Sequence, residues 1–286
     1  MKNVCLLAVL KMLLVASAHA ENVEIYYDYK PFAKDLEASV GSGLSSITTL
    51  RALENISVEH SFQHLPFDRI ALELKTNNKP ACSLFKIKND EREEQFLFSL
   101  PLAFQSNYRL YMQAYLPEPP ANLVSNGEVS SLDGLLKFYP SSKLVLTEGI
   151  SYGEELDQIL EGLDASQVIK VRGVDRNAIH ARMFAYQRAD FTVAFPAQMN
   201  RFSGARGNLK YESLRIKELP TLVSLYIMCN THPQSEAFLQ EVNKNVVDMY
   251  FEESFLETHL QFQPAEEHKL LTEKISLIRK QMSKQE

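Results

Sequence analysis

The sequence lacks a long apolar run after its first twenty residues, it has only 3 cysteines, and its basic residues are fewer than its acidic ones. Because a membrane-spanning helix needs about 20 consecutive apolar residues, the missing run excludes a transmembrane segment after residue 20. The shortage of lysine and arginine disfavours nucleic acid and anionic lipid as partners. Repeats and low-complexity tracts are also missing, so we expect an ordinary globular protein.

The N-terminus has the features of a cleaved export signal. Lys2 supplies a positive end, residues 4–15 are apolar apart from Lys11, and residues 18–20 (Ala-His-Ala) form a cleavage site. The apolar stretch is too short to anchor the chain in a membrane, and no cysteine stands at the cleavage point to carry a lipid. We predict a signal peptide over residues 1–20, whose removal lowers the basic residues from 30 to 28 against 36 acidic ones, a net charge of −8.

Two cysteines, Cys82 and Cys229, remain after removal of the signal. An oxidising compartment permits an even pair of cysteines to form a disulfide. Two buried free thiols are the alternative, and the residues alone do not decide between them.

The first third of the mature chain alternates between strand and helix patterns. Residues 23–27 are rich in strand formers, and apolar residues from Leu44 to Leu53 recur at helical spacing. An extended piece follows at 57–62, Asp68 can cap a further helix, and residues 81–86 form a buried strand. This βαβαβ order predicts parallel strands with right-handed crossovers in an α/β layer.

A second α/β layer is expected after the proline-rich segment 117–120. Strand and helix patterns alternate again, with expected strands at residues 143–146, 168–171 and 191–195. The polar stretch 200–208 then suggests a return to the first layer. The chain ends in amphipathic helical patterns.

One stretch resembles a known family. In residues 82–101 a strand leads to a turn containing Arg92 and then to Phe98-Ser99-Leu100-Pro101. This resembles the family 3 extracellular solute-binding proteins, which have a strand, a Thr-x-x-Arg-like turn and Phe-Ser-x-Pro-Tyr. The resemblance implies a two-lobed type II periplasmic-binding-protein fold, each lobe a mixed, mostly parallel sheet flanked by helices, joined by two crossing segments.

The resemblance also implies lobe boundaries and a disulfide. The first lobe would hold residues 21–107 and 197–286, and the second lobe residues 108–196. In this fold the strand at residues 222–229 lies beside the strand that holds Cys82. That placement favours a bond between Cys82 and Cys229, provided that the side-chain geometry allows it.

Arg92 falls where the family keeps an arginine that binds a ligand carboxylate. A guanidinium group can hold a carboxylate through two parallel charge-assisted hydrogen bonds. The alternative is a surface arginine paired with Glu91, Glu93 or Glu94, since exposed ion pairs are common.

Residues 146–153 resemble the family's second ligand-binding turn. Gly149, Ser151 and Tyr152 lie where backbone N–H groups at a helix start would meet the anion, and the family's residue at Ser151 adds a hydroxyl. Ser151 as a simple helix cap is the plain alternative.

The segment Gly149-Ile150-Ser151-Tyr152-Gly153 also spells the nucleophile elbow of α/β hydrolases. Asp190 and His232 follow in the order that a Ser-Asp-His triad requires. Against a secreted serine hydrolase, no His-Gly-Gly oxyanion segment precedes Ser151.

Aromatic residues complete the expected site. Tyr29 and Phe32 follow the first strand, where the family often has an aromatic platform; packing in the core or at the rim is the alternative. Phe195 stands where amino-acid binders of the family place an aspartate for the ligand ammonium. An ordinary α-amino acid is therefore in doubt, because a buried ammonium without a carboxylate is costly, and Glu148 or Asp28 would have to substitute.

The expected function is non-enzymatic capture of a small polar, carboxylate-bearing solute in the periplasm by a monomer that delivers it to a transporter permease. The alternative within the fold is ligand sensing through a membrane partner. We expect no cofactor and no metal. His60 and His64 lack a third ligand nearby in the sequence.

Overall fold

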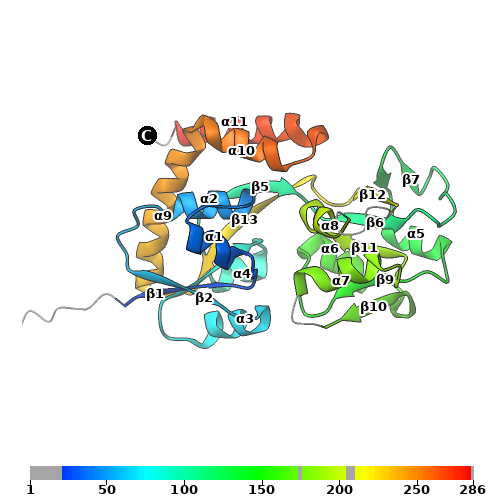
Figure 1. The fold of residues 1–286 in the computed structure, drawn as a ribbon, viewed down its shortest axis with the longest axis horizontal. Coiled ribbons are helices and arrows are strands. Elements are labelled where there is room, and N and C mark those ends of the chain that lie inside the picture. Colours follow the sequence, from blue (N-terminus) through cyan, green and yellow to red (C-terminus); the bar gives the residue numbers. More distant parts are fainter. Residues whose placement is uncertain (1–20, 173–175, 204–209, 285–286) are drawn as a thin grey trace, which may run out of the picture.

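The computed structural model describes residues 21–172, 176–203 and 210–284, so the expected signal peptide lies outside the described residues. Two α/β lobes lie side by side, with the C-terminal helices above the first lobe (Figure 1). Each lobe is built on its own sheet, and we call the lobe that contains the N-terminal strand the first lobe. This agrees with the expected two α/β layers.

The first sheet has the order β2-β1-β3-β13-β4, with β5 also paired to β13. Strands β1 (Val23–Tyr27), β2 (His60–His64) and β3 (Ala81–Lys86) are parallel, as the βαβαβ pattern predicted. Strand β13 returns antiparallel to β3. The other elements in this part of the chain are α1 (Phe32–Ala38), α2 (Leu44–Ala52), α3 (Phe67–Thr76), α4 (Asp90–Gln95), β4 (Leu97–Phe98), β5 (Ala103–Ser106) and β13 (Leu222–Cys229).

The second sheet has the order β10-β9-β11-β6-β12-β8-β7, with parallel and antiparallel pairs. Its strands are β6 (Arg109–Gln113), β7 (Val124–Ser125), β8 (Glu128–Val129), β9 (Leu144–Thr147), β10 (Val168–Val171), β11 (Phe191–Ala194) and β12 (Tyr211–Ile216). Its helices are α5 (Leu132–Phe138), α6 (Glu154–Glu161), the short 3-10 helix η1 (Ala165–Gln167), α7 (Arg176–Ala185) and α8 (Pro196–Ser203). Strands β9 and β11 are buried along their whole length, which explains their continuous apolar sequences.

Two segments cross between the lobes. The first joins β5 to β6 through Asn107 and Tyr108, close to the expected boundary. The second joins β12 to β13 at residues 217–221. Asn107 holds the two together, because its backbone N–H donates to the Thr221 carbonyl (2.9 Å) and its side-chain amide donates to the Pro220 carbonyl (2.9 Å).

The second boundary differs from the one expected near residue 197. Strand β12 pairs with β6 and β8, so the chain stays in the second lobe until Ile216. The polar stretch before β12 resembled a crossing segment in sequence. Only the pairing partners of β12 show which sheet it belongs to, and strand pairing over about a hundred residues leaves no local signal.

A disulfide joins the first lobe's central strands. Cys82 of β3 and Cys229 of β13 are directly opposite in the register and bonded, with 3.9 Å between their Cα atoms. Both are fully buried in a core formed by β1, β3, β13 and the long helix α9 (Pro233–Phe251). The bond closes a loop with a sequence separation of 147, which contains the whole second lobe.

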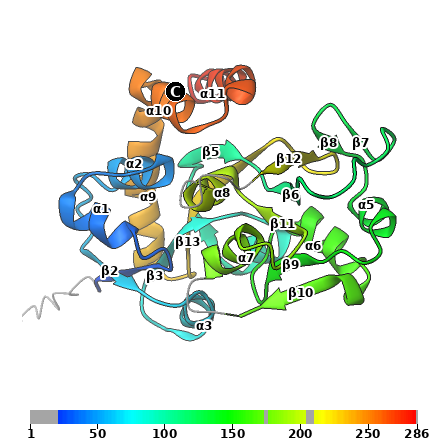
Figure 2. The same ribbon diagram turned by 45° about the vertical axis from the view of Figure 1, so that its right-hand side comes forward.

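The C-terminal helices pack on the first lobe (Figure 2). Helix α9 starts with Pro233, and the ring of His232 accepts a hydrogen bond from the Gln234 N–H (3.1 Å). After it come α10 (Glu253–Phe262), the 3-10 turn η2 (Ala265–Glu267) and α11 (His268–Met282). Leu271 and Ile275 of α11 are buried in the core of the first lobe, so the apolar stripe of α11 packs on its own chain. None of the helices in the described ranges has the length and apolar character that a membrane crossing needs.

Candidate functional site

A cavity of about 480 Å³ lies between the two lobes. The first lobe contributes Asp28, Lys86 and Arg92 to its wall, and the second lobe contributes Ser151 and Phe195, with Tyr108 from the first crossing. Most of these residues follow the carboxyl end of a strand, where open α/β sheets place their ligands. The cavity is therefore the candidate functional site.

Arg92 lies on the short helix α4 and lines the cavity. The side chain of Asn89 caps this helix by accepting the Arg92 backbone N–H (3.0 Å). One guanidinium nitrogen donates to the Ile87 carbonyl at 2.8 Å, which fixes the direction of the side chain. Burial lowers the pKa of Arg92, and the charge of Asp157 opposes that shift. The guanidinium stays charged, because an arginine pKa lies so far above neutrality.

The plain alternative for Arg92, a surface ion pair with its glutamate neighbours, is not what the structure contains. Glu93 pairs with Lys88 instead. Within the described ranges no carboxylate lies in ion-pair distance of Arg92. Its remaining N–H groups are thus available to a molecule in the cavity.

Lys86 is a second cation at the cavity that we did not predict from the sequence. It is the last residue of β3 and only 6% exposed, and its ammonium lies 4.8 Å from the centre of the Phe67 ring. Burial lowers its pKa, the negative charge of Asp28 opposes that shift, and the charge of Arg92 adds to it. The signal in the sequence was a lysine at the end of a strand whose other residues are apolar apart from Ser83.

The turn after β9 brings Ile150 and Ser151 to the cavity, whereas Gly149 and Tyr152 do not line it. Gly149 has a φ of 75°, in the left-handed region that glycine adopts without strain. The hydroxyl of Tyr152 is turned inward, where it accepts the Thr147 N–H at 2.8 Å. Burial is the main cause that raises the pKa of Tyr152 to about 12.

The hydroxyl of Ser151 donates to the carboxylate of Asp157 (2.6 Å) and accepts the Gly153 N–H (3.2 Å). The same carboxylate accepts the Tyr152 N–H at 2.8 Å. Ser151 therefore helps to fix the start of α6, as a cap does. Its one proton is committed to Asp157, so in this arrangement the hydroxyl offers a lone pair to the cavity.

Aromatic residues form much of the cavity wall. Phe195 stacks on Tyr108, with 3.8 Å between ring centres and 23° between planes. Tyr29 lines the cavity from the first lobe. Phe32 instead lies fully buried in the first lobe's core, edge-on to Phe85 at 5.2 Å, because its position on α1 faces the sheet. Tyr108 was not predicted from the sequence.

The residues of the candidate serine triad lie apart in the structure. Ser151 follows the end of β9 by four positions rather than standing at a tight strand-to-helix turn. The carboxylate of Asp190 accepts hydrogen bonds from the Lys143 N–H and the Tyr115 hydroxyl, both at 2.7 Å. His232 caps α9 in the first lobe. Neither has a hydrogen bond to Ser151 in the part of the chain that the structure describes.

A metal site is not found among the described residues, because no three His, Cys, Asp or Glu side chains gather as ligands would.

The two alternative carboxylates for a ligand ammonium have different positions. Asp28 lines the cavity. Glu148 does not, and it forms a two-pronged ion pair with Arg172.

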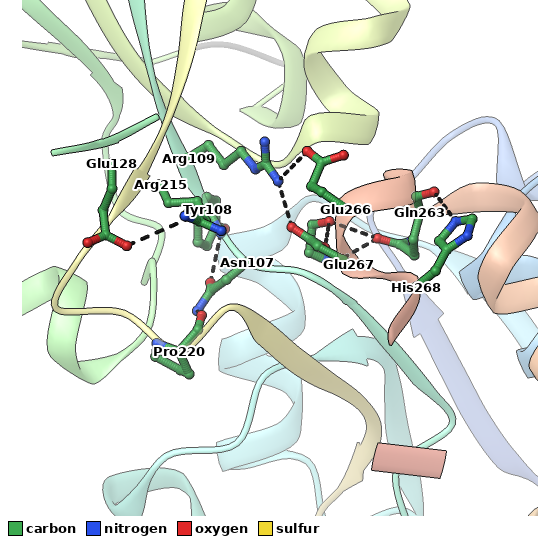
Figure 3. A network of polar contacts seen from close by, with 11 residues as sticks. Asn107, Tyr108, Arg109, Glu128, Arg215, Pro220, Gln263, Glu266, Glu267 and His268 are labelled. Atoms are coloured by element: carbon green, nitrogen blue, oxygen red, sulfur yellow. Dashed lines mark hydrogen bonds and ion pairs between the residues drawn. The ribbon is translucent and has the colours of Figure 1, made fainter. Parts of the chain in front are cut away.

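The hinge carries a polar network next to the cavity (Figure 3). Arg109, the first residue of β6, forms an ion pair with the 2% exposed Glu267 of η2 (2.6 Å) and with the exposed Glu266 (3.2 Å). Ser106 contacts Glu267, and its backbone N–H donates to the side chain of Gln263 (2.8 Å). Gln263 also lines the cavity, so the segment after α10 contributes to both hinge and cavity wall.

Comparison with known proteins assigns the fold. No family model matches the sequence, and no curated protein matches it. A histidine kinase sensor domain with similarity to periplasmic binding proteins superposes with a TM-score of 0.59 at 12% identity, covering 84% of this chain and 95% of its own. The protein has a type II periplasmic-binding-protein fold.

Two further structures with this periplasmic-binding fold are amino-acid binders. The GluR0 ligand-binding core from Nostoc punctiforme, in complex with L-glutamate, has a TM-score of 0.56 and 16% identity and covers 84% of this chain and 98% of its own. An arginine transport-system periplasmic binding protein from Legionella pneumophila has a TM-score of 0.51 and 18% identity and covers 85% and 99%. The expected fold is confirmed. Sequence identities this low support the fold alone and do not identify a ligand or a role.

Proposed function

We propose that this protein is a periplasmic solute-binding protein that captures a small carboxylate-bearing solute between its lobes. The observation that carries the proposal is the position of Arg92 in a cavity whose walls come from both lobes. A ligand there contacts both lobes at once and so favours the closed form.

Arg92 has the chemistry that carboxylate capture needs. Its side chain is held by the Ile87 carbonyl and meets no acid in ion-pair distance among the described residues. Two parallel hydrogen bonds from a guanidinium group to a carboxylate give both affinity and orientation. The aromatic walls at Tyr29, Tyr108 and Phe195 suit the apolar body of such a solute.

We further propose that the captured solute is delivered to a membrane transporter. The disulfide between Cys82 and Cys229 fits an oxidising compartment such as the periplasm. Sensing is the second candidate, because one of the structural matches is a histidine kinase sensor domain. Deleting the gene separates these outputs. Loss of uptake of the solute supports transport, whereas unchanged uptake with an altered transcriptional response to the solute supports sensing.

A thermal-shift screen of amino acids, organic acids and short peptides tests ligand capture. We expect at least one carboxylate to raise the melting temperature of the wild-type protein. Arg92→Ala should abolish that rise, and Arg92→Lys should retain only part of it, because a lysine cannot make the two-pronged bond. The control is Arg69→Ala, which removes an exposed arginine that pairs with Glu73 on the surface of α3.

Two results would contradict the proposal. One is a screen in which Arg92→Ala responds to every stabilising acid as the wild type does. The other is covalent labelling of Ser151 by a serine-reactive fluorophosphonate, which would indicate an activated nucleophile and favour the hydrolase alternative.

A further inference from the structure

The backbone is irregular at the end of β3, where three consecutive residues border the cavity. Phe85, Lys86 and Ile87 all line it, whereas successive residues of a regular strand point to opposite faces. Phe85 has a φ of 59°, and the pairing of β3 with β13 shifts register between Tyr226 and Met228. The left-handed region is costly for a bulky side chain, so the fold retains strain at the place that presents Lys86.

The ammonium of Lys86 lacks an acceptor in the part of the chain that the structure describes. It has no hydrogen bond and no carboxylate in ion-pair distance there, and it lies over the face of the Phe67 ring. The side chain is nevertheless 6% exposed and lines the cavity. The ammonium can therefore receive its acceptor from a molecule bound in the cavity.

The charges around the cavity are unbalanced. Among the described residues that line it, Lys86 and Arg92 are cations and Asp28 is the one acid. The charge of Asp28 acts on Lys86, and Glu148, the other acid considered as an ammonium partner, is bound to Arg172 away from the cavity. The wall is thus net positive, although the whole chain carries a formal charge of −6.

A zwitterionic amino acid fits this wall poorly. Its carboxylate would satisfy one cation, but its ammonium would add a third positive group beside Lys86 and Arg92. Asp28 is the one acid among the described residues of the wall, and its charge already acts on Lys86, so it would have to compensate Lys86 and the ligand ammonium together. Phe195 and Tyr108 offer that ammonium no further carboxylate. A molecule with net negative charge satisfies both cations without this repulsion.

We propose that Lys86, together with Arg92, makes the cleft selective for organic acids that carry net negative charge and no ammonium group. The inference rests on the proposed solute-binding function and specifies the ligand class. Arg92 holds the first carboxylate. Lys86 binds a second anionic oxygen, either of the same carboxylate or of another acidic group, and repels ammonium groups.

Matched acid pairs test this selectivity. Each pair shares a carbon skeleton with and without the α-amino group: glutamate and glutarate, phenylalanine and 3-phenylpropionate, leucine and 4-methylpentanoate. Isothermal titration measures the Kd of each compound for the wild type. We expect the deaminated acid of at least one pair to bind tenfold or more tighter than its amino acid.

Lys86→Met supplies the second arm, because methionine keeps much of the apolar stem without the charge. We expect this variant to weaken binding of the deaminated acid about tenfold and to bring the ratio within the pair close to one. The matched control is Lys88→Met, whose lysine is two positions away, more exposed and paired with Glu93. The control should keep the wild-type ratio. If Lys86→Met does not fold, Lys86→Gln replaces it.

The outcomes distinguish the two proposals. If wild-type protein prefers the amino acid in every pair that binds and Arg92→Ala abolishes that binding, the selectivity inference is wrong and the solute-binding function stands. If the ratio of the two Kd values within a pair is the same in Lys86→Met as in the wild type, the role of Lys86 in selectivity is wrong, and the solute-binding function is unaffected. If no acid or amino acid binds the wild type, in these pairs or in the wider screen, both proposals fail.

Discussion

At the scale of single residues, buried polar side chains differ in whether the protein itself supplies their hydrogen-bond partners. Lys86 faces the cavity without an acceptor among the described residues, whereas His259 of α10 is fully buried and has a partner at each ring nitrogen. Its Nε2 accepts the Phe104 N–H at 3.0 Å, and its Nδ1 lies 2.6 Å from the Phe255 carbonyl. This arrangement needs the neutral ring, with the proton on Nδ1.

The neutral state of His259 predicts a pH dependence of stability. Burial lowers its pKa from 6.5 to about 4, against the opposing hydrogen bond to Phe255. Above pH 6.5 the ring is neutral in both folded and unfolded chains. As the pH falls below 6.5 the unfolded chain gains a proton that the folded chain excludes, so stability is lost until about pH 4. The loss amounts to about 3 kcal/mol.

Urea unfolding at pH 7.5 and pH 4.5 measures this loss. His259→Gln provides the comparison, because glutamine can keep a donor and an acceptor but does not titrate in this range. We expect the variant to be less stable than the wild type at pH 7.5 and to lose less stability on acidification. Equal losses in the two proteins would refute the assignment.

At the scale of elements, the C-terminal segment connects to the second lobe. Glu267 of η2 is 2% exposed and Arg109 of β6 is 11% exposed, and their ion pair spans the two lobes beside the hinge (Figure 3). Breaking a buried pair from one side leaves an uncompensated charge, which typically costs about 3–5 kcal/mol. The C-terminal segment therefore both covers the first lobe and binds the second lobe through this ion pair.

We predict that Glu267→Gln lowers the free energy of unfolding by about 2–3 kcal/mol, less than the usual range because Glu266 can still partly compensate Arg109. The matched control is Glu266→Gln, which removes the exposed partner and should cost less than about 1 kcal/mol. Chemical denaturation measures both. Equal losses in the free energy of unfolding would show that the buried ion pair stabilises the protein no more than the exposed one.

At the scale of the whole molecule, the lobes are joined only through two short crossings in the described ranges and by contacts beside them. The cavity wall comes from both sides, with Arg92 and Lys86 opposite Ser151 and Phe195. A ligand that contacts both walls shifts the population toward the closed arrangement. At 100 times its Kd it also stabilises the folded protein by about 2.7 kcal/mol.

Small-angle X-ray scattering tests closure directly. We predict that the radius of gyration decreases when the tightest ligand from the acid panel is added to the wild type. Arg92→Ala at the same ligand concentration should show no decrease. A wild-type radius that stays constant at saturation would mean that binding occurs without closure.

Local patterns predicted much of the fold. Apolar spacing gave the parallel βαβαβ order of β1 to β3, and the strand signals at β9, β10 and β11 gave the second layer, because these preferences depend on neighbours in sequence. The second crossing was misplaced by some twenty residues. The membership of β12 in the second sheet depends on its pairing with β6, about a hundred positions away.

The candidate site was predicted less completely than the fold. Arg92, Ser151, Tyr29 and Phe195 lie at the cavity, and the residues around Arg92 and Ser151 carried the family resemblance that singled them out. Tyr152 and Phe32 face inward, because the turn after β9 and the helix α1 rotate their side chains into the lobes. That rotation depends on the packing of each lobe rather than on residue type.

By itself the sequence determined the alternation of strands and helices, the arginine turn and the two cysteines available for bonding, since each follows from local spacing or residue chemistry. Only the tertiary structure decided that Cys82 meets Cys229, that Lys86 stands buried beside Arg92, and that the segment after α10 reaches the hinge. These contacts join residues far apart in the chain. They exist only where the packed lobes bring them together, and that packing also determines the charge of the cavity.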